Sequence, residues 1–201
     1  MTKPSTRDIR RQQLRQSILD AARRIISQGG VGSLNMRAIA SEINYSPAAI
    51  YEYFDGKQEI VETVCYQGYR RLAQYMQQVD ESLPPSEHLT QLGLAYLRFA
   101  LENPEFYLVM FTTVPSDEAA QEIRAEGSTF DTLLQAIQRG VDEGVFKTRK
   151  GFNARNMAYA SWAHVHGIAM LLITFLSKPE ILSELANRET IEAFFRGLEA
   201  G

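Results

Sequence analysis

Residue types on which metal-binding and secreted proteins depend are scarce in this chain of 201 residues. Cys65 is the only cysteine, so no intramolecular disulfide can form, which fits a reducing compartment. There are three histidines, and none has further His, Cys or carboxylate residues around it at the spacing of a metal site. We therefore expect neither a disulfide framework nor a bound metal.

Arrangements that carry out catalysis are also missing. The stretch Gly29–Gly32 follows no predicted strand and precedes no lysine, so it does not match a phosphate-binding loop. Ser161 lies near His164, but no acidic residue nearby could orient the histidine. Because no nucleophile has a base beside it, we expect a protein without enzymatic activity and without a cofactor.

Charge is distributed unevenly along the chain. The formal net charge is −3, but residues 1–60 contain nine Lys and Arg against six Asp and Glu, whereas residues 61–201 contain twelve against eighteen. The basic residues before position 25 are Lys3, Arg7, Arg10, Arg11, Arg15, Arg23 and Arg24. Such asymmetry is typical of a protein with a nucleic-acid-binding end. The alternative is a basic helix that only faces solvent.

One long uncharged segment raises the question of a membrane span. Residues 156–177 contain no Asp, Glu, Lys or Arg and are long enough to cross a bilayer. His164 and His166 near its middle would be costly in a lone span, so we expect a helix covered by its own domain and by a second subunit. The first thirty residues have no apolar core of a secretory signal, and we expect a cytoplasmic protein.

Apolar residues recur at helical spacing almost throughout, which predicts an all-α fold of about nine helices. The residues expected to begin or cap the first eight helices are, in order, Thr6, Asn35, Ser46, Asp55, Ser86, Asn103, Ser116 or Asp117, and Asn153, and the last helix contains Ile191. We expect Gln58 to complete a capping box with Asp55, and Pro179 to end the eighth helix. The predicted domains are a three-helix N-terminal domain at residues 1–56 and a larger helical domain at 57–201.

The stretch "NYSPAAIYEYFDGK", residues 44–57, predicts a helix-turn-helix. Asn44 tolerates the left-handed conformation of a turn, and Ser46 with Pro47 is a helix cap followed by a first-turn proline. Ile50 and Phe54 are four apart and should face inward. Small and phenolic side chains then remain outside, where methyl groups could meet thymine methyls and hydroxyls could donate to phosphates.

We predict that this segment and its neighbours contact DNA. Lys57 falls in the first turn of the next helix, where an ammonium would be unfavourable unless a phosphate lay opposite it. The predicted DNA-binding residues are Asn35, Arg37, Tyr45, Ser46, Pro47, Ala48, Ala49, Tyr51, Tyr53 and Lys57. The alternative is a plain corner of a helical bundle with half-buried tyrosines.

The arrangement "GSLNMRAIASEINYSPAAIYEYFDGKQEI" resembles the DNA-binding domain of the tetracycline-repressor-like (TetR) family of bacterial regulators. The family pattern is matched by Ile39, Ala40, Ser46, Tyr51, Tyr53, Phe54, Lys57 and Ile60. Asn44 replaces a usual glycine, Tyr45 a small aliphatic residue, and Asn35 a common threonine cap. The resemblance implies a dimeric, ligand-responsive transcription factor, most often a repressor, that binds a near-palindromic operator.

In the C-terminal part, the fragment "WAHVHGIAML" resembles the Trp…His-Gly pattern of the WHG-type domain of some family members. His166 could be a core histidine bonded to a neighbour, a polar group in a ligand pocket, or a metal ligand. Residues that could line a pocket for a small, apolar effector are Tyr96, Phe99, Phe106, Met110, Phe130, Tyr159, Trp162 and His166. An alternative is a helix-turn-helix protein with no effector.

The last two helices are expected to form a homodimer. An apolar stripe at helical spacing ends the chain, and a small domain would not leave such a stripe in water. The predicted interface residues are Gly167, Leu171, Ile191, Phe194, Phe195 and Leu198. Together with a partner's copies they would make a four-helix bundle.

Overall fold

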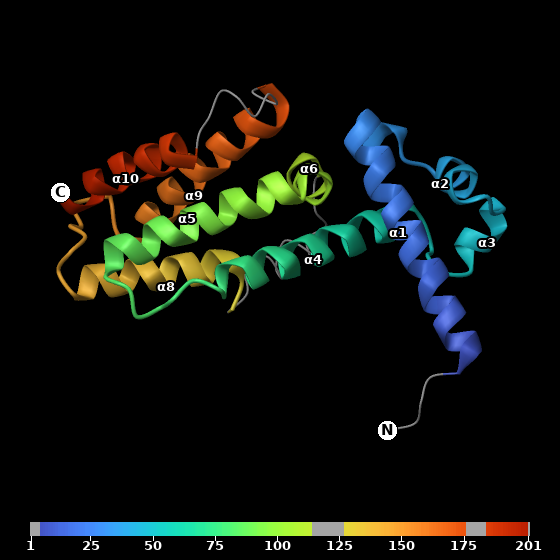
Figure 1. Ribbon diagram of the computed structural model, residues 1–201, viewed down its shortest axis with the longest axis horizontal. Coiled ribbons are helices and arrows are strands. Elements are labelled where there is room, and N and C mark those ends of the chain that lie inside the picture. The colour runs from blue at the N-terminus through green and yellow to red at the C-terminus, as the bar shows by residue number, and fades with distance from the viewer. Residues whose placement is uncertain (1–4, 114–126, 176–183, 201) are drawn as a thin grey trace. The chain divides into compact units, whose positions relative to one another are not determined.

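The computed structural model describes residues 5–113, 127–175 and 184–200, and all regular structure in these ranges is helical (Figure 1). Nine α-helices and one π-helical turn are found there. A bridge between Arg149 and Phe152 closes a turn and belongs to no sheet. The predicted all-α fold is confirmed.

The described chain forms two compact units, and their boundary differs from the expected one at residues 56 and 57. The first unit comprises residues 5–68 and 104–113, and the second comprises 69–103, 127–175 and 184–200. The first turns of α4 (Lys57–Met76) belong to the first unit, as does α6 (Pro104–Thr112). An amphipathic pattern cannot show this, because it does not say which partner a helix packs against.

The first unit is built around α1 (Thr6–Ser33), which contacts both α2 (Met36–Ile43) and α6. The short helix α3 (Pro47–Tyr51) packs on α2. α1 loses helical geometry at Gly30, whose φ of 71° lies in the left-handed region. The glycine-rich stretch Gly29–Gly32 therefore contains a kink, after which a short helical segment runs to Ser33.

Buried apolar side chains from all these helices form the core of the first unit. They include Ile18, Leu19, Ala22, Ile26, Ile39, Ile50, Phe54, Ile60 and Val64. The guanidinium of Arg23 lies over the Phe106 ring, 4.2 Å from its centroid, and 3.9 Å from the Glu105 carboxylate. These contacts join α6 to α1.

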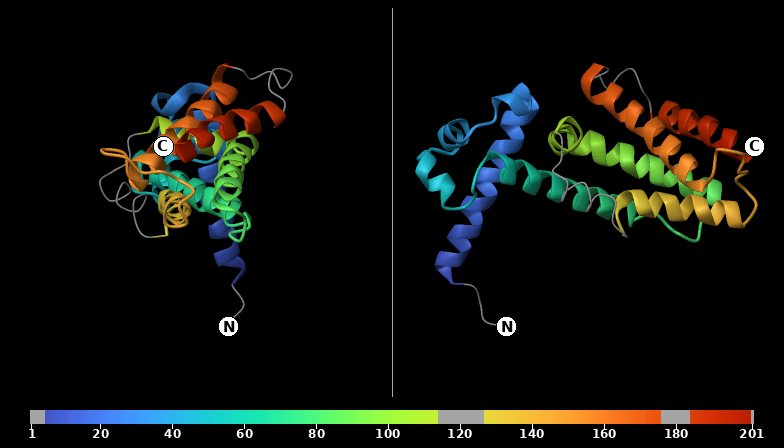
Figure 2. Two further views of the ribbon diagram at one scale, coloured as in Figure 1. Left: turned by 90° about the vertical axis from the view of Figure 1, so that its left-hand side faces the viewer. Right: turned by 180° about the vertical axis from the view of Figure 1, so that it is seen from behind.

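The second unit is a helical bundle in which α5 (Pro85–Glu102) contacts three other helices (Figures 1 and 2). These are α8 (Thr129–Asp142), α9 (Ala154–Met170) and α10 (Glu184–Ala200). α9 continues as the π-helical turn η1 (Leu171–Phe175). Gly93 of α5 lets its neighbours approach, because a Cβ there would be only 3.3 Å from Val165 and 3.4 Å from Ile191.

Several predicted helix caps need correction. The partner of the Asp55 amide is the Glu59 carboxylate at 2.7 Å, whereas Gln58 donates to Glu62. α5 begins after Pro84 without a side-chain cap, and the Ser86 hydroxyl donates to Glu199 instead. The Asn103 amide group donates to the Phe99 carbonyl and to the Tyr75 hydroxyl. The side chains of Gln58, Ser86 and Asn103 therefore bond to groups other than the predicted cap partners.

The predicted caps at Asn35, Ser46 and Asn153 are confirmed, because each accepts a backbone hydrogen bond in the first turn of its helix. Ser116, Asp117 and Pro179 lie outside the described residues. The helix that was expected to start at Ser116 or Asp117 is described from Thr129, with Ser128 as its cap.

Within the described ranges, one helical stretch is long and apolar enough to cross a membrane, namely Ala154–Phe175. It contacts α5, α8 and α10 as a member of the bundle. Only 22% of its most apolar window is buried within the subunit, so much of its surface is open to a further partner.

Candidate DNA-reading surface and effector site

The α2–turn–α3 segment is held by its own polar residues. The Asn35 side chain accepts from the Ala38 amide at 2.9 Å, and the Ser46 hydroxyl accepts from the Ala49 amide at 3.2 Å. Asn44 adopts the left-handed conformation, with φ 58° and ψ 44°. Asn44 can do so because Asn is one of the few non-glycine residues that tolerate this region. The turn expected from the sequence is thus present.

The two sides of the α3 segment separate as predicted. Ile50 and Phe54 are 0% and 2% exposed and belong to the core. Ala48 is exposed near the start of the helix, and Tyr51 is 56% exposed. Tyr45 in the turn is 50% exposed, so its ring reaches solvent. Ala48 and the phenolic side chains of Tyr45 and Tyr51 are therefore accessible on the segment.

The other residues predicted to contact DNA differ in how exposed they are. Arg37 is exposed on α2, and Pro47 is exposed at the start of α3. Ala49 and Tyr53 are half-buried. Asn35 is exposed, but its side chain is engaged at both ends, since its amide group also donates to the Ser33 carbonyl at 3.4 Å.

Lys57 has an intramolecular partner that the sequence did not reveal. Its ammonium donates to the Val31 carbonyl at 2.6 Å, in a part-buried position. The expectation that this charge needs a phosphate opposite it is corrected, because a carbonyl near the kink of α1 already accepts from it. An ammonium has three donors, so this bond leaves capacity for a further acceptor.

Five of the eight predicted pocket residues meet in one aromatic cluster. The rings of Phe130, Tyr159 and His166 each lie between 6.1 and 6.2 Å from the Trp162 ring. The Tyr96 hydroxyl of α5 accepts from the Trp162 indole at 3.3 Å and lies 3.1 Å from Nδ1 of His166. Burial lowers the pKa of His166, which favours a neutral imidazole at this position.

The remaining three predicted pocket residues do not join this cluster. Phe99 is fully buried on α5 and packs edge-to-face on Tyr75 at 5.7 Å. Phe106 and Met110 belong to α6 in the first unit, where Phe106 lies under Arg23. A Cβ at Gly68 would meet the Met110 sulfur at 2.4 Å, so Met110 fills the space above that glycine.

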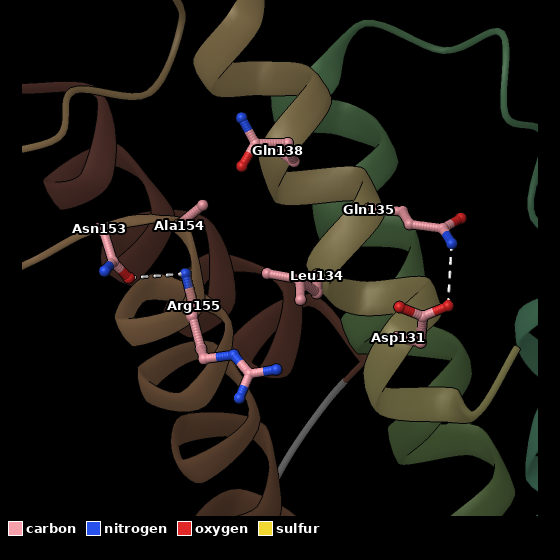
Figure 3. Close-up of a pocket in the computed structure, with 7 residues that line it drawn as sticks. All are labelled: Asp131, Leu134, Gln135, Gln138, Asn153, Ala154 and Arg155. Atoms are coloured by element: carbon pink, nitrogen blue, oxygen red, sulfur yellow. Dashed lines mark hydrogen bonds between the residues drawn. The ribbon is translucent and has the colours of Figure 1, made fainter. Parts of the chain in front are cut away.

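The structure contains an open surface pocket that the sequence did not indicate (Figure 3). It has a volume of about 620 Å³ and lies between α8 and the start of α9. Its lining residues are Asp131, Leu134, Gln135, Gln138, Asn153, Ala154 and Arg155. None of the predicted pocket residues is among them, and no periodic pattern in the sequence brings these two segments together.

The predicted dimer interface on α10 is corrected. Ile191, Phe195 and Leu198 are 0%, 2% and 6% exposed, because they pack inside their own subunit. Phe194 is half-buried and stacks on His164, with 4.3 Å between ring centroids and 10° between planes. Of the predicted interface residues, Leu171 is 53% exposed, and a Cβ at Gly167 would have no heavy atom within 4 Å.

Residues 18–64 match the family model of bacterial regulatory proteins of the tetR family, and residues 89–177 match the model of the tetracyclin repressor-like C-terminal domain. The chain belongs to the TetR family. Members of this family are helix-turn-helix transcriptional regulators, and the N-terminal match includes α2 and α3.

Curated relatives of this TetR-family chain match it over 32–60% of their own length. The HTH-type transcriptional regulator YobS of Bacillus subtilis is 30% identical over 90 residues, which are 45% of this chain and 47% of that protein. The nicotine-responsive transcriptional repressor HdnoR of Paenarthrobacter nicotinovorans is 37% identical over 70 residues, which are 35% of this chain and 32% of that protein.

Solved structures of TetR-family regulators share the fold. One from Rhodococcus RHA1 has a TM-score of 0.76 at 18% identity and covers 92% of this chain and 96% of its own. PfmR from Thermus thermophilus has a TM-score of 0.71 at 21% identity and covers 92% of this chain and 97% of its own. At such identities the likeness establishes architecture alone.

Proposed function

We propose that this TetR-family regulator is a cytoplasmic homodimeric repressor that binds a near-palindromic operator and is released by a small, apolar effector. The observation that carries the proposal is the capped α2–turn–α3 segment, with Ala48 and Tyr51 exposed and Ile50 and Phe54 buried. A recognition helix of this kind enters the major groove, where its first residues reach base edges.

The DNA contacts in this proposal follow from side-chain chemistry. Ala48 and Ala49 allow close approach of the helix and offer methyl groups to thymine. The phenols of Tyr45, Tyr51 and Tyr53 donate to phosphate oxygens, as does the guanidinium of Arg37. Ser46 and Pro47 fix where the helix begins, while Asn35 fixes the start of α2. Lys57 contributes a positive charge behind them.

The dimer in this proposal forms through α9. Tyr159, Ala163, Gly167 and Leu171 recur every fourth residue and therefore share one face of the helix. Tyr159 is 63% and Leu171 53% exposed, and Gly167 leaves room for a partner helix to approach. Two such faces packed together would cover apolar surface that the subunit alone leaves in water.

The effector site in this proposal is the aromatic cluster around Trp162. The cluster offers ring faces from Phe130 and Tyr159, with a polar group at His166, and such a mixture suits an apolar ligand with one polar atom. The relative HdnoR is named as nicotine-responsive, and that match supports a ligand-responsive role here. The surface pocket beside Arg155 is a second candidate because of its volume.

Communication between effector and DNA would use α4, whose residues are shared by both units. An effector that binds better to one position of α4 shifts the separation of the two recognition helices. A coupling free energy of roughly 1–3 kcal/mol corresponds to about a 5–150-fold change in DNA affinity, enough for a transcriptional switch.

The experiment is a screen of small apolar compounds in which Trp162 emission and release of DNA are read together. Trp162 is the only tryptophan, so its emission reports on the cluster alone. We expect active compounds to change both signals in the native protein, and His166→Leu to alter the response while leaving DNA affinity nearly unchanged. Compounds that release DNA equally from both proteins, with emission unmoved, would remove the cluster as the effector site.

A helix-turn-helix protein without any effector remains the second candidate, favoured by how completely Tyr96 and Phe99 are buried. It predicts that no compound moves Trp162 emission or DNA affinity. His166→Leu would then act on stability only. The change removes one hydrogen-bond partner of the Tyr96 hydroxyl, at a cost of roughly 1–3 kcal/mol.

A further inference from the structure

The N-terminal turns of α1 lie outside the DNA-binding domain that the family shares. α1 begins at Thr6, whereas the family match begins at residue 18, which is also the first fully buried residue of the helix. Twelve residues precede Ile18, which corresponds to about 18 Å of helix. Apart from the half-buried Leu14, all of them are exposed. These turns project beyond α2 and α3 (Figures 1 and 2).

This projecting segment is strongly basic on one side. Successive residues of a helix are about 100° apart, so Arg7, Arg11 and Arg15, four residues apart, form a row with steps of about 6 Å. The row continues the same side of α1 that carries Ile18 and Ala22 inside the core. The same side of α1 is thus apolar from Ile18 onward and cationic in the turns before it.

Two contacts place this row of arginines beside the residues that follow α3. The guanidinium carbon of Arg15 is 4.7 Å from the Phe54 ring centroid, and that of Arg11 is 5.9 Å from the Tyr53 centroid. Both rings follow directly after α3. Arginines that stack on these rings retain their charge and their outward N–H groups.

Among the described residues, no carboxylate forms an ion pair with the row. The ion pairs found there involve neither Arg7, Arg11 nor Arg15. Asp8 is the acidic residue nearby, and its carboxylate accepts from both the hydroxyl and the amide of Ser5 in a capping box. Those bonds are the largest causes that lower the pKa of Asp8, ahead of the charge of Arg11.

We propose that the projecting turns of α1 are a second DNA-contacting surface, in which Arg7, Arg11 and Arg15 bind backbone phosphates flanking the half-site read by α3. Guanidinium groups match phosphate oxygens in a two-pronged geometry and stay charged at every relevant pH. Such contacts lengthen the footprint and raise affinity without reading sequence. This inference rests on operator binding by α3 and adds a separate surface to it.

The test compares native protein with Arg7→Gln/Arg11→Gln, with Arg11→Gln alone, and with the matched control Arg10→Gln. Arg10 is exposed on the same turns but lies about 100° away from Arg11 around the helix. Glutamine keeps helix propensity and removes the charge, so melting temperatures should not change. The probe is a DNA duplex selected from a random-sequence library, used with long flanks and with flanks trimmed to the half-sites.

We expect the double variant to bind the long duplex more weakly and with a shallower salt dependence. Removing four phosphate contacts per dimer lowers the slope of log affinity against log salt by about 3.6, so the native advantage shrinks about a hundredfold between about 50 and 200 mM salt. Trimming the flanks should weaken the native protein more than the double variant, which retains only Arg15 of the row. Arg10→Gln should lose less affinity than Arg11→Gln.

Equal losses for Arg10→Gln and Arg11→Gln would overturn the proposal, because overall charge would then explain the effect. An unchanged salt slope, or equal sensitivity to trimming in native and double variant, would overturn it as well. If the native protein enriched no duplex at all, operator binding itself would fail, and this surface with it. The behaviour of the native protein thus separates the two failures.

Discussion

At the scale of single residues, local polar roles could be predicted and long-range ones could not. Asn35, Ser46 and Asn44 were predictable because their partners lie within three or four residues along the chain. The partner of Lys57 could not be predicted because its acceptor, the Val31 carbonyl, lies 26 residues away, next to the kink at Gly30. A spacing rule contains no information about such a contact.

Lys57→Met should therefore lower the stability of the regulator. Loss of the Lys57 ammonium removes a charge-assisted hydrogen bond and leaves the Val31 carbonyl with only the Leu34 amide at 3.3 Å, which costs roughly 1–3 kcal/mol. Urea unfolding should show a lower midpoint, and Gln58→Met, at the exposed neighbouring position, should not. If Lys57 also binds phosphate, the salt slope of DNA binding falls by about 0.9 per subunit. An unchanged midpoint would show that the bond to Val31 contributes nothing.

His88 predicts a loss of stability in acid. It is 6% exposed, and its Nδ1 has no hydrogen-bond partner among the described residues. Its pKa is lowered mainly by burial and next by the charge of Arg139, against opposing effects of Glu81 and Asp80. The unfolded chain, with a histidine pKa of about 6.5, then takes up a proton that the folded chain does not, so stability falls as the pH drops through that value.

Replacing His88 by leucine removes this proton uptake. The melting temperature of the native protein should fall between about pH 7.5 and 5.5, and that of His88→Leu should fall less. His166 shifts in the same direction through burial, so part of the dependence remains in the variant. Equal falls in both proteins would mean that His88 is not held neutral by the fold.

At the scale of helices, the periodicity indicated which faces are apolar but not what covers them. The α10 stripe was assigned to a dimer interface, yet Ile191, Phe195 and Leu198 are covered by their own subunit. α9 was expected to be covered on two sides, and the subunit buries only 22% of its most apolar window. Which helices cover an apolar face depends on how the whole bundle packs, so the sequence of a single helix cannot show it.

This difference between the two helices can be tested by substitution. Tyr159→Arg with Leu171→Glu should give a folded monomer, because both side chains are exposed on α9 and its continuation. Phe195→Glu should unfold the protein, since a buried unpaired carboxylate has a large desolvation cost. Circular dichroism and analytical ultracentrifugation separate the two outcomes. A double α9 variant that stays dimeric would place the interface elsewhere.

At the scale of the whole molecule, the fold class and the helix-turn-helix motif were predictable, whereas the residues that meet in the candidate effector site were not. The helix-turn-helix is built from contacts between neighbours in sequence, so its residue pattern was enough to identify the TetR family. The aromatic cluster joins Tyr96 of α5 to Trp162 across 66 residues, and the surface pocket joins α8 to α9. Composition alone could not separate Phe99 or Phe106, which pack in cores, from Phe130 beside Trp162.

The central claim is that two copies of the α2–α3 segment in one dimer read symmetric DNA. Its most direct test is selection of bound duplexes from a random library, followed by sedimentation of the complex, for native protein and for Ala48→Glu. Glutamate in the first turn of α3 is compatible with the helix dipole, so the variant should fold while its charge and bulk repel DNA. Gln74→Glu, which adds the same charge at an exposed position of α4, is the control.

We predict enrichment of an inverted repeat with half-sites about 34–36 Å apart or a multiple of that distance, bound by two protomers. Ala48→Glu should enrich nothing and Gln74→Glu should enrich the same repeat. An asymmetric site bound by a single protomer, or equal enrichment by native protein and Ala48→Glu, would contradict the account.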